Sequence, residues 1–199
     1  MPENDREKSR ETADNFENIN GERGEVIPEI FHKKAADIKI ICLDVDGVLT
    51  DGRIILGSEG QEYKAFDAKD GQAIKIAQQR GLEFALITGR RSRAVEIRAD
   101  ELDISEVYQN VSSKIDIIEK LLKKYNYNLA NVLYTGDDIS DLQAIKKSGL
   151  GCTVKDGAKE AKNIADYTAD NAGGRGAVRE IIELLLKTRG AWLKYLTVN

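Results

Sequence analysis

The feature that most restricts the fold is an alternation, from Ile38 onward, of short apolar runs with segments whose apolar residues recur at helical spacing. Five short runs predict buried strands, over residues 38–43, 82–87, 106–108, 131–134 and 150–154. Six longer segments predict helices, over residues 72–80, 92–102, 113–125, 139–148, 158–164 and 176–187. This order is typical of an α/β fold with a doubly wound, mainly parallel sheet.

One interval between the first strand and the first helix departs from this alternation. Residues 53–56 and 62–66 are two β-prone runs, and the turn-forming sequence Gly-Ser-Glu-Gly lies between them. The pattern predicts a β-hairpin over residues 53–66, inserted after the first strand. Since open α/β sheets bind their ligands at the carboxyl ends of their strands, we expect this hairpin to lie over the ligand site.

The chain divides into two parts of different composition. Residues 1–30 hold nine acidic and four basic side chains and few large apolar ones, so residues 1–36 predict an acidic, disordered extension. Residues 37–199 predict one folded domain, which includes the hairpin and a C-terminal segment over residues 171–199. Most of the formal net charge of −4 therefore comes from the extension.

Composition also excludes several kinds of partner. A chain with a net charge of −4 is not a globally basic nucleic-acid binder, so we expect no nucleic-acid partner. No stretch approaches the roughly 20 apolar residues that span a bilayer, and the polar N-terminal sequence does not fit a secretory signal. We therefore expect no membrane contact and a cytoplasmic location, with Cys42 and Cys152 as buried strand residues.

Polar side chains follow the carboxyl ends of three predicted strands. Asp44 and Asp46 follow the first strand, Thr88 follows the second, and Asp137 with Asp138 follows the fourth. Carboxylates that crowd at one edge of a sheet repel one another unless a cation lies among them, and hard oxygen ligands favour Mg²⁺. The sequence therefore predicts a magnesium site in the crevice at this edge.

The same side chains suit phosphoryl transfer. The Asp44 carboxylate can attack phosphorus to give an aspartyl phosphate, and Asp46, two residues further along an extended chain, can protonate the leaving oxygen. The Thr88 hydroxyl, nearby backbone N–H groups and Lys114, at the start of a predicted helix, can hold the phosphoryl group. Asp46 can then activate the water molecule that releases phosphate.

These motifs resemble those of the haloacid dehalogenase superfamily of phosphatases. LDVDGVLT at residues 43–50 is similar to the first motif of that superfamily, and ITGR at residues 87–90 is similar to the second. Lys114 corresponds to the third motif, and GDDISD at residues 136–141 corresponds to the fourth. The resemblance implies Mg²⁺-dependent phosphatase activity on the predicted fold.

The resemblance also assigns roles residue by residue. It implies that Asp44 is the nucleophile and a metal ligand, and that Asp46 is the general acid and base and a ligand through its backbone carbonyl. It implies that Asp137 is the third protein ligand of the metal. It implies that Thr88 and Lys114 bind phosphate. It also implies that Asp138 and Asp141 are supporting carboxylates.

Over residues 39–190 the chain further resembles a small-cap branch of this superfamily, the 3-deoxy-D-manno-octulosonate 8-phosphate phosphatases. The similar segments are DVDGVLTDG, the hairpin, KDG, ITGRRS, VYQ, GDD and AGGRGAVRE. The branch implies a phosphorylated keto sugar acid as substrate and a role in lipopolysaccharide or other surface-sugar biosynthesis. It also implies a homotetramer in which the hairpin and residues 173–176 help to complete a neighbouring site. The implied substrate-binding residues, besides those above, are Gly89, Arg90, Arg98, Gly173, Gly174 and Arg175.

Three other functions stay open alongside this interpretation. A sister branch acting on nine-carbon sialic-type acid phosphates tends to carry Glu in place of Arg90 and Lys in place of Glu101, which favours the octulosonate branch here. Receiver domains of two-component signalling share the phosphorylated Asp and Mg²⁺, but their accepting Asp follows the third strand, which here ends in VYQ. A catalytically silent oligomerisation partner is disfavoured because every catalytic position is filled.

Overall fold

The predicted parallel sheet is present, and its central strand leads directly to the first acidic motif. The computed structural model describes residues 27–192. The strands of the large sheet are β1 (Ile40–Leu43), β4 (Glu83–Ile87), β5 (Glu106–Tyr108), β6 (Val132–Thr135), β7 (Leu150–Thr153) and β8 (Tyr167–Thr168). They pair in parallel in the order β5-β4-β1-β6-β7-β8. The strand order therefore reverses next to β1, where open sheets of this kind bind ligands.

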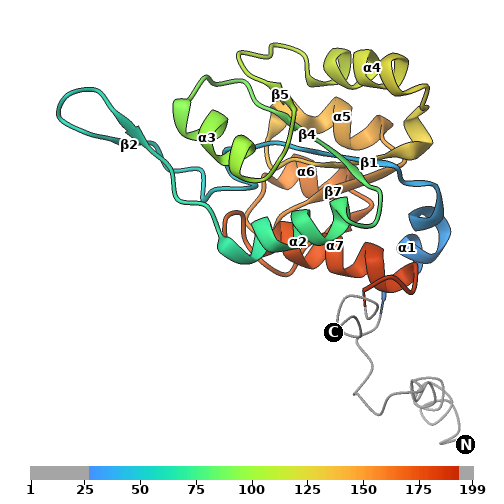
Figure 1. Cartoon of the computed structure of the whole chain (residues 1–199). Coiled ribbons are helices and arrows are strands. Elements are labelled where there is room, and N and C mark those ends of the chain that lie inside the picture. The colour runs from blue at the N-terminus through green and yellow to red at the C-terminus, as the bar shows by residue number, and fades with distance from the viewer. Residues whose placement is uncertain (1–26, 193–199) are drawn as a thin grey trace, which may run out of the picture.

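Helices cover both faces of this sheet (Figure 1). One face packs against α1 (Glu29–Lys34), α2 (Ala68–Gln78), α3 (Arg93–Glu101) and α7 (Ala177–Thr188), and the other against α4 (Lys114–Tyr125), α5 (Leu142–Lys147) and α6 (Lys159–Ile164). Residues of β1 alternate between the two cores, with Ile41 and Leu43 on the α2 and α7 side and Ile40 and Cys42 on the α4 and α5 side. This two-sided burial explains the continuous apolar runs of the sequence.

The hairpin after the first strand is also confirmed. It consists of β2 (Ile55–Leu56) and β3 (Glu62–Tyr63), which pair antiparallel with Ile55 opposite Tyr63. In Figure 1 it extends away from the body of the domain as an arm. Within residues 27–192, no helix is long and apolar enough to cross a membrane.

The folded part begins earlier than the expected boundary at residue 37. Helix α1 and a 3-10 turn, η1 (Ala35–Asp37), precede β1, and Phe31 in α1 is fully buried. The Phe31 ring packs edge-on against Tyr167, with ring centroids 5.1 Å apart. The reason is that the apolar residues of this short segment cover the end of α7 and one face of β8. The rest of the expected extension, residues 1–26, and residues 193–199 of the C-terminal segment lie outside the described residues.

Other differences from the predicted elements are local. Helix α2 begins at Ala68 because Asp67 caps it, its Oδ1 accepting a hydrogen bond of 2.6 Å from the Lys69 N–H. The predicted helix over 139–148 is divided into a 3-10 turn, η3 (Ile139–Asp141), and α5. A second 3-10 turn, η2 (Leu129–Asn131), precedes β6. The two-residue strand β8 has too short an apolar run to be predicted.

Candidate active site

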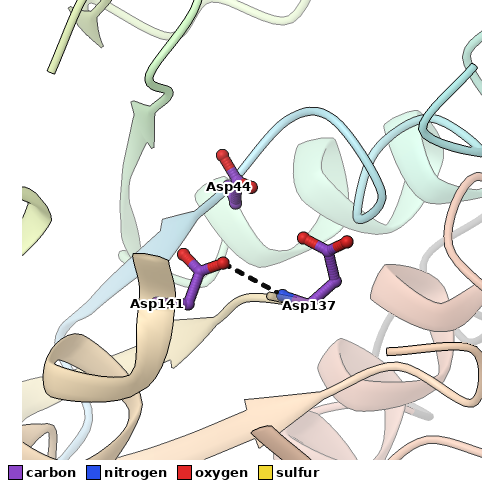
Figure 2. Close-up of side chains that lie close together, drawn as sticks. All are labelled: Asp44, Asp137 and Asp141. Atoms are coloured by element: carbon purple, nitrogen blue, oxygen red, sulfur yellow. Dashed lines mark hydrogen bonds between the residues drawn. The ribbon is translucent and has the colours of Figure 1, made fainter. Parts of the chain in front are cut away.

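Three carboxylates meet at the carboxyl ends of β1 and β6 (Figure 2). Asp44 follows β1, Asp137 follows β6, and Asp141 ends the η3 turn. One oxygen from each of these carboxylates lies within 4.8 Å of the others. Asp44 and Asp137 are thus brought together as the sequence predicts, whereas Asp138 is exposed to solvent and lies outside the group.

Asp141 is the centre of a buried hydrogen-bond network. Its side chain is completely buried, and its Oδ1 accepts hydrogen bonds from Lys114 Nζ at 2.6 Å and from the Tyr134 hydroxyl at 2.5 Å. Its Oδ2 accepts from the backbone N–H groups of Asp137 and Asp138, at 3.2 and 3.1 Å. Asp141 therefore fixes both the Lys114 ammonium group and the turn that carries Asp137.

Lys114 joins this network to the expected nucleophile. It is the first residue of α4, and its Nζ lies 3.0 Å from Asp44 Oδ1. The side chains of both residues are less than a tenth exposed. A single ammonium group thus serves two buried carboxylates, so the cluster carries an excess of negative charge.

The electrostatics of the cluster suit a divalent cation. Burial, opposed by the Lys114 charge, raises the pKa of Asp44 to about 6. Burial and the negative charges of Asp44 and Asp141 raise the pKa of Asp137 to about 8. In addition, Asp137 Oδ1 is buried without a hydrogen-bond partner. Hard carboxylate oxygens with unneutralised charge and a free lone pair are what Mg²⁺ binds in proteins, so these residues fit that metal.

Asp46 is held from a different direction, by the hairpin. Its carboxylate forms an ion pair with Lys64, and its Oδ2 lies 3.7 Å from Arg90 Nε. Both cations also contact Glu62, Lys64 at 3.1 Å and Arg90 at 2.7 Å. The sequence predicts no role for Glu62 or Lys64, and the one signal for them is that they alternate on one face of a predicted strand.

Thr88 occupies the expected place at the end of β4. The residue is only 2% exposed, and its Oγ1 accepts a hydrogen bond of 3.3 Å from the Arg90 N–H. Backbone hydrogen bonds to Tyr108 and Val111 fix it on both sides. Gly89 is exposed and follows it. The strand end therefore presents a hydroxyl group and backbone N–H groups at the same edge as Asp44.

Comparison with known proteins places this geometry in a family. Residues 95–182 match the haloacid dehalogenase-like hydrolase family. The chain is 43% identical over 167 residues to the 3-deoxy-D-manno-octulosonate 8-phosphate phosphatase KdsC of Salmonella typhimurium, covering 84% of this chain and 88% of that protein. The chain belongs to this phosphatase family. The KdsC of Escherichia coli strain K12 is 44% identical over 157 residues, covering 79% of this chain and 84% of that protein.

Solved structures of octulosonate phosphatases agree with the fold. The protein from Moraxella catarrhalis, in complex with magnesium, phosphate and KDO, has a TM-score of 0.82 and 40% identity, covering 83% of this chain and 95% of that one. The cobalt-bound protein from Haemophilus influenzae has a TM-score of 0.79 and 31% identity, covering 82% of this chain and 96% of that one. The family's fold thus extends over nearly all of the described residues.

Arg98, expected to bind substrate as in octulosonate phosphatases, lies at the base of the hairpin. Its guanidinium group donates to the Asp67 carbonyl at 3.2 Å, pairs with Glu101 at 2.8 Å and lies 5.7 Å from the centre of the Phe66 ring. Its side chain is 15% exposed. In this chain Arg98 therefore joins α3 to the start of α2, apart from the three carboxylates.

The glycines of the tail pack closely against the loop that follows β1. Within the chain, Gly173 and Gly174 press against the Gly47–Thr50 loop, and their expected role at a neighbouring subunit's site stays a prediction. The Gly174 N–H donates to the Val48 carbonyl at 2.9 Å. A Cβ atom on Gly173 would lie 1.8 Å from the Gly47 oxygen, so no other residue fits there. Arg175 is exposed, 4.0 Å from Asp51, beside a cavity of about 400 Å³ at the hairpin base.

Proposed function

We propose that this chain is a Mg²⁺-dependent phosphatase of 3-deoxy-D-manno-octulosonate 8-phosphate. The observation that carries this proposal is the buried group of Asp44, Asp137 and Asp141 around Lys114, with Asp46 held beside it. The family membership, and the names of its relatives, supply the substrate. Receiver-like signalling is not favoured, because the structure holds a second acid, Asp46, two residues after the nucleophile.

The first step forms a bond between Asp44 and phosphorus. An Asp44 carboxylate oxygen attacks phosphorus while the bond from phosphorus to the sugar oxygen breaks. The leaving oxygen takes a proton from Asp46, so the sugar acid departs as a neutral alcohol at that position. Lys114 keeps Asp44 ionised and oriented, since its Nζ contacts Asp44 and is itself fixed by Asp141.

The second step reverses the role of Asp46. As a base it removes a proton from a water molecule, whose oxygen attacks phosphorus and breaks the bond to Asp44. Phosphate leaves, and Asp44 returns to its carboxylate form. Asp44, Asp137 and the Asp46 backbone carbonyl would hold Mg²⁺, and the metal would neutralise charge on the phosphoryl oxygens. Thr88 and Lys114 bind those same oxygens.

The substrate is distinguished by its second acidic group, a carboxylate, which guanidinium groups bind well. Arg90 is the best placed of the expected arginines, since it is 45% exposed and already lies beside Asp46. Gly89 gives the substrate room at the strand end, and Arg98 and Arg175 are assigned to the sugar-acid side with the tail glycines Gly173 and Gly174. The nine-carbon alternative is not favoured by the names of the relatives.

A direct comparison of substrates tests the proposal. With Mg²⁺ present, kcat/KM for octulosonate 8-phosphate is expected to exceed that for nine-carbon keto-acid 9-phosphates and for simple sugar phosphates. A preference for simple sugar phosphates would contradict it. Asp44→Asn is expected to reduce kcat by at least about 10³-fold, because it removes the nucleophile. Asp100→Asn, an exposed Asp of α3, is the matched control and should retain activity.

The assembly we propose is a homotetramer built through the hairpin. Ile54, Ile55, Leu56 and Tyr63 are 49–67% exposed, and an exposed cluster of large apolar residues on one arm favours a protein interface. Light scattering is expected to give four times the chain mass, and Leu56→Glu should reduce it. A fully active wild-type monomer would contradict this assembly.

The compartment we propose is the cytoplasm. Cys42 and Cys152 are both free and fully buried, which is compatible with a reducing compartment. Cell fractionation with an antibody against the chain is expected to recover it with cytoplasmic marker enzymes, and recovery outside that fraction would contradict the assignment.

A further inference from the structure

Glu180, in the first turns of α7, collects four hydrogen bonds that no step of the proposed mechanism uses. Its Oε1 accepts from the Tyr167 hydroxyl at 2.6 Å and from the Asp170 N–H at 2.8 Å. Its Oε2 accepts from the Asn171 N–H at 2.9 Å and from Asn171 Nδ2 at 2.7 Å. Both carboxylate oxygens thus face only donors, and all of the donors belong to residues 167–171.

The helix that carries Glu180 is itself anchored. The buried Asp70 of α2 accepts a hydrogen bond of 2.7 Å from the Arg179 N–H, at the N-terminal end of α7. The Glu180 N–H donates to the Gly176 carbonyl at 3.0 Å. A carboxylate at a helix N-terminus also interacts favourably with the helix dipole. Glu180 therefore holds residues 167–171 from a fixed support.

The segment held by Glu180 leads directly to the catalytic loop. Two residues after Asn171, the Gly173 N–H donates to Asp156 Oδ1 at 2.9 Å, and Gly174 donates to the Val48 carbonyl. Gly173 lies so close to Gly47 that a Cβ atom would be 1.8 Å from the Gly47 oxygen. Because backbone packs directly on backbone here, with no side chain between them, a displacement of residues 173 and 174 would move the Gly47–Thr50 loop.

On its other side, the same loop contacts the carboxylate cluster. Gly47 has a φ of +91°, and a Cβ atom there would lie 2.1 Å from Asp137 Oδ2. The residue before it is Asp46, the proposed general acid. The loop is therefore held between the tail glycines and Asp137, and the position of the Asp46 backbone depends on both contacts.

We infer that Glu180 is a positioning residue for catalysis: by ordering residues 167–174 against the Gly47–Thr50 loop, it sets where Asp46 stands relative to the leaving oxygen. This inference rests on the proposed function, because it needs a general acid at Asp46. A misplacement of about 1 Å at such a group can cost about 100-fold in rate.

Glu180→Gln tests the inference with a nearly isosteric change. The amide places an NH2 group against two of the four donors, so the segment cannot keep all of its hydrogen bonds. Glu183→Gln is the matched control, since Glu183 lies on the same helix but pairs only with Arg179 and Lys187 among the contacts described. It removes the same charge without contacting residues 167–171.

The readout compares two leaving groups. Octulosonate 8-phosphate releases an alcohol, which needs a proton from the general acid, whereas 4-nitrophenyl phosphate releases a phenolate that needs little help. For Glu180→Gln we expect kcat/KM to fall at least about 10-fold with the sugar acid phosphate and less than about 3-fold with the aryl phosphate. Glu183→Gln should change neither value. An equal loss on both substrates, or no loss on either, overturns the inference.

Two further measurements separate the possible failures. Wild-type protein that does not hydrolyse octulosonate 8-phosphate overturns the proposed function, and the leaving-group comparison is then made with an alkyl phosphate that the wild type does hydrolyse. If Glu180→Gln does not fold, Tyr167→Phe removes one of the four donors without changing a charge. It should show the same difference between substrates at a smaller size, and an equal effect on both overturns the inference.

Discussion

The two halves of the active site are built in different ways. The half around Asp141 is buried and comes from the ends of β1 and β6 and the start of α4. Its centre is the Asp141 carboxylate, which accepts hydrogen bonds from four donors. The half around Asp46 is partly exposed and depends on Lys64 and Arg90, which reach it from the hairpin and from the end of β4. The first half is fixed by the core of the domain, whereas the second depends on the position of a two-stranded arm.

The difference in burial fits the different roles proposed for the two halves. The proposed metal site and nucleophile need a constant geometry through both proposed steps, which a buried network provides. The proposed general acid, Asp46, must meet leaving groups that enter and depart, and its partners come from the hairpin and the end of β4. We expect changes in the first half to affect stability and activity together, and changes in the second half to affect activity more than stability.

The largest effect is expected for Asp141→Asn. The substitution removes the charge that pairs with the buried Lys114 and replaces one of the two acceptor oxygens with an NH2 donor, and breaking a buried ion pair costs about 3–5 kcal/mol. Urea unfolding should show that loss, and kcat should fall at least about 10-fold because Lys114 and the Asp137 turn lose their position. Asp138→Asn is the control. It changes an exposed neighbour and should alter the free energy of unfolding by less than about 0.5 kcal/mol. Equal effects of the two substitutions would remove the distinction between the halves.

A smaller effect, mainly on activity, is expected for Lys64→Met. The Lys64 side chain is only 1% exposed, and methionine keeps most of its apolar length while removing the contact with Asp46. Steady-state assays should show kcat/KM reduced about 10-fold. The melting temperature should fall less than in Asp141→Asn, since Lys64 lies outside both cores and its two carboxylate partners are partly exposed. Arg53→Met, on the exposed part of the hairpin, should leave both quantities unchanged. A melting temperature that falls as far as in Asp141→Asn would show that the hairpin is part of the stable core.

The smallest effect concerns pH and metal. Without metal, the pKa values of Asp44 and Asp137 in the folded chain, about 6 and about 8, lie above their ordinary value of 3.8. Groups shifted in this direction stabilise the folded chain fully below pH 3.8 and lose that contribution as pH rises through 6 and then 8. In EDTA, their contribution to the melting temperature should therefore be smaller at pH 8.5 than at pH 5.

Mg²⁺ should compensate for this loss, because it binds the ionised carboxylates. Its addition is expected to raise the melting temperature by a few degrees more at pH 8.5 than at pH 5, as measured by differential scanning calorimetry. Asp137→Asn should abolish most of that difference. A metal-induced increase that does not depend on pH would contradict the charge arrangement described for the cluster.

The sequence predicted the first half of the site better than the second. Asp44, Thr88 and Asp137 each follow a buried strand, and parallel strands bring such residues to one edge whatever the details of packing. A role for Tyr134 could not be predicted, because its hydroxyl group contacts Asp141 only when the turn after β6 brings Asp141 back beside the strand. A role for Lys64 could not be predicted either. The position of the hairpin is set by tertiary contacts and not by the alternation of side chains within the hairpin sequence.

The same reasoning explains the fold-level differences. The helices and strands of the sheet were predicted because periodicity is a local property of the sequence. Helix α1 was expected to be part of a tail, because Phe31 is buried by packing against Tyr167, which lies far away in the sequence. The packing of Gly173 and Gly174 on their own chain is likewise a long-range contact that no local pattern contains.

The attachment of α1 also bears on how the chain folds during synthesis. Arg189 Nε, just after α7, donates to the Ala35 carbonyl at 2.8 Å, a contact between residues 154 positions apart. Contacts of such high sequence separation form late, because a long loop must close first. The segment that precedes β1 is therefore synthesised before the surface on which it packs, and it docks only after α7 is present. Until translation reaches α7, the buried side of Phe31 has no complete partner surface and stays exposed to solvent.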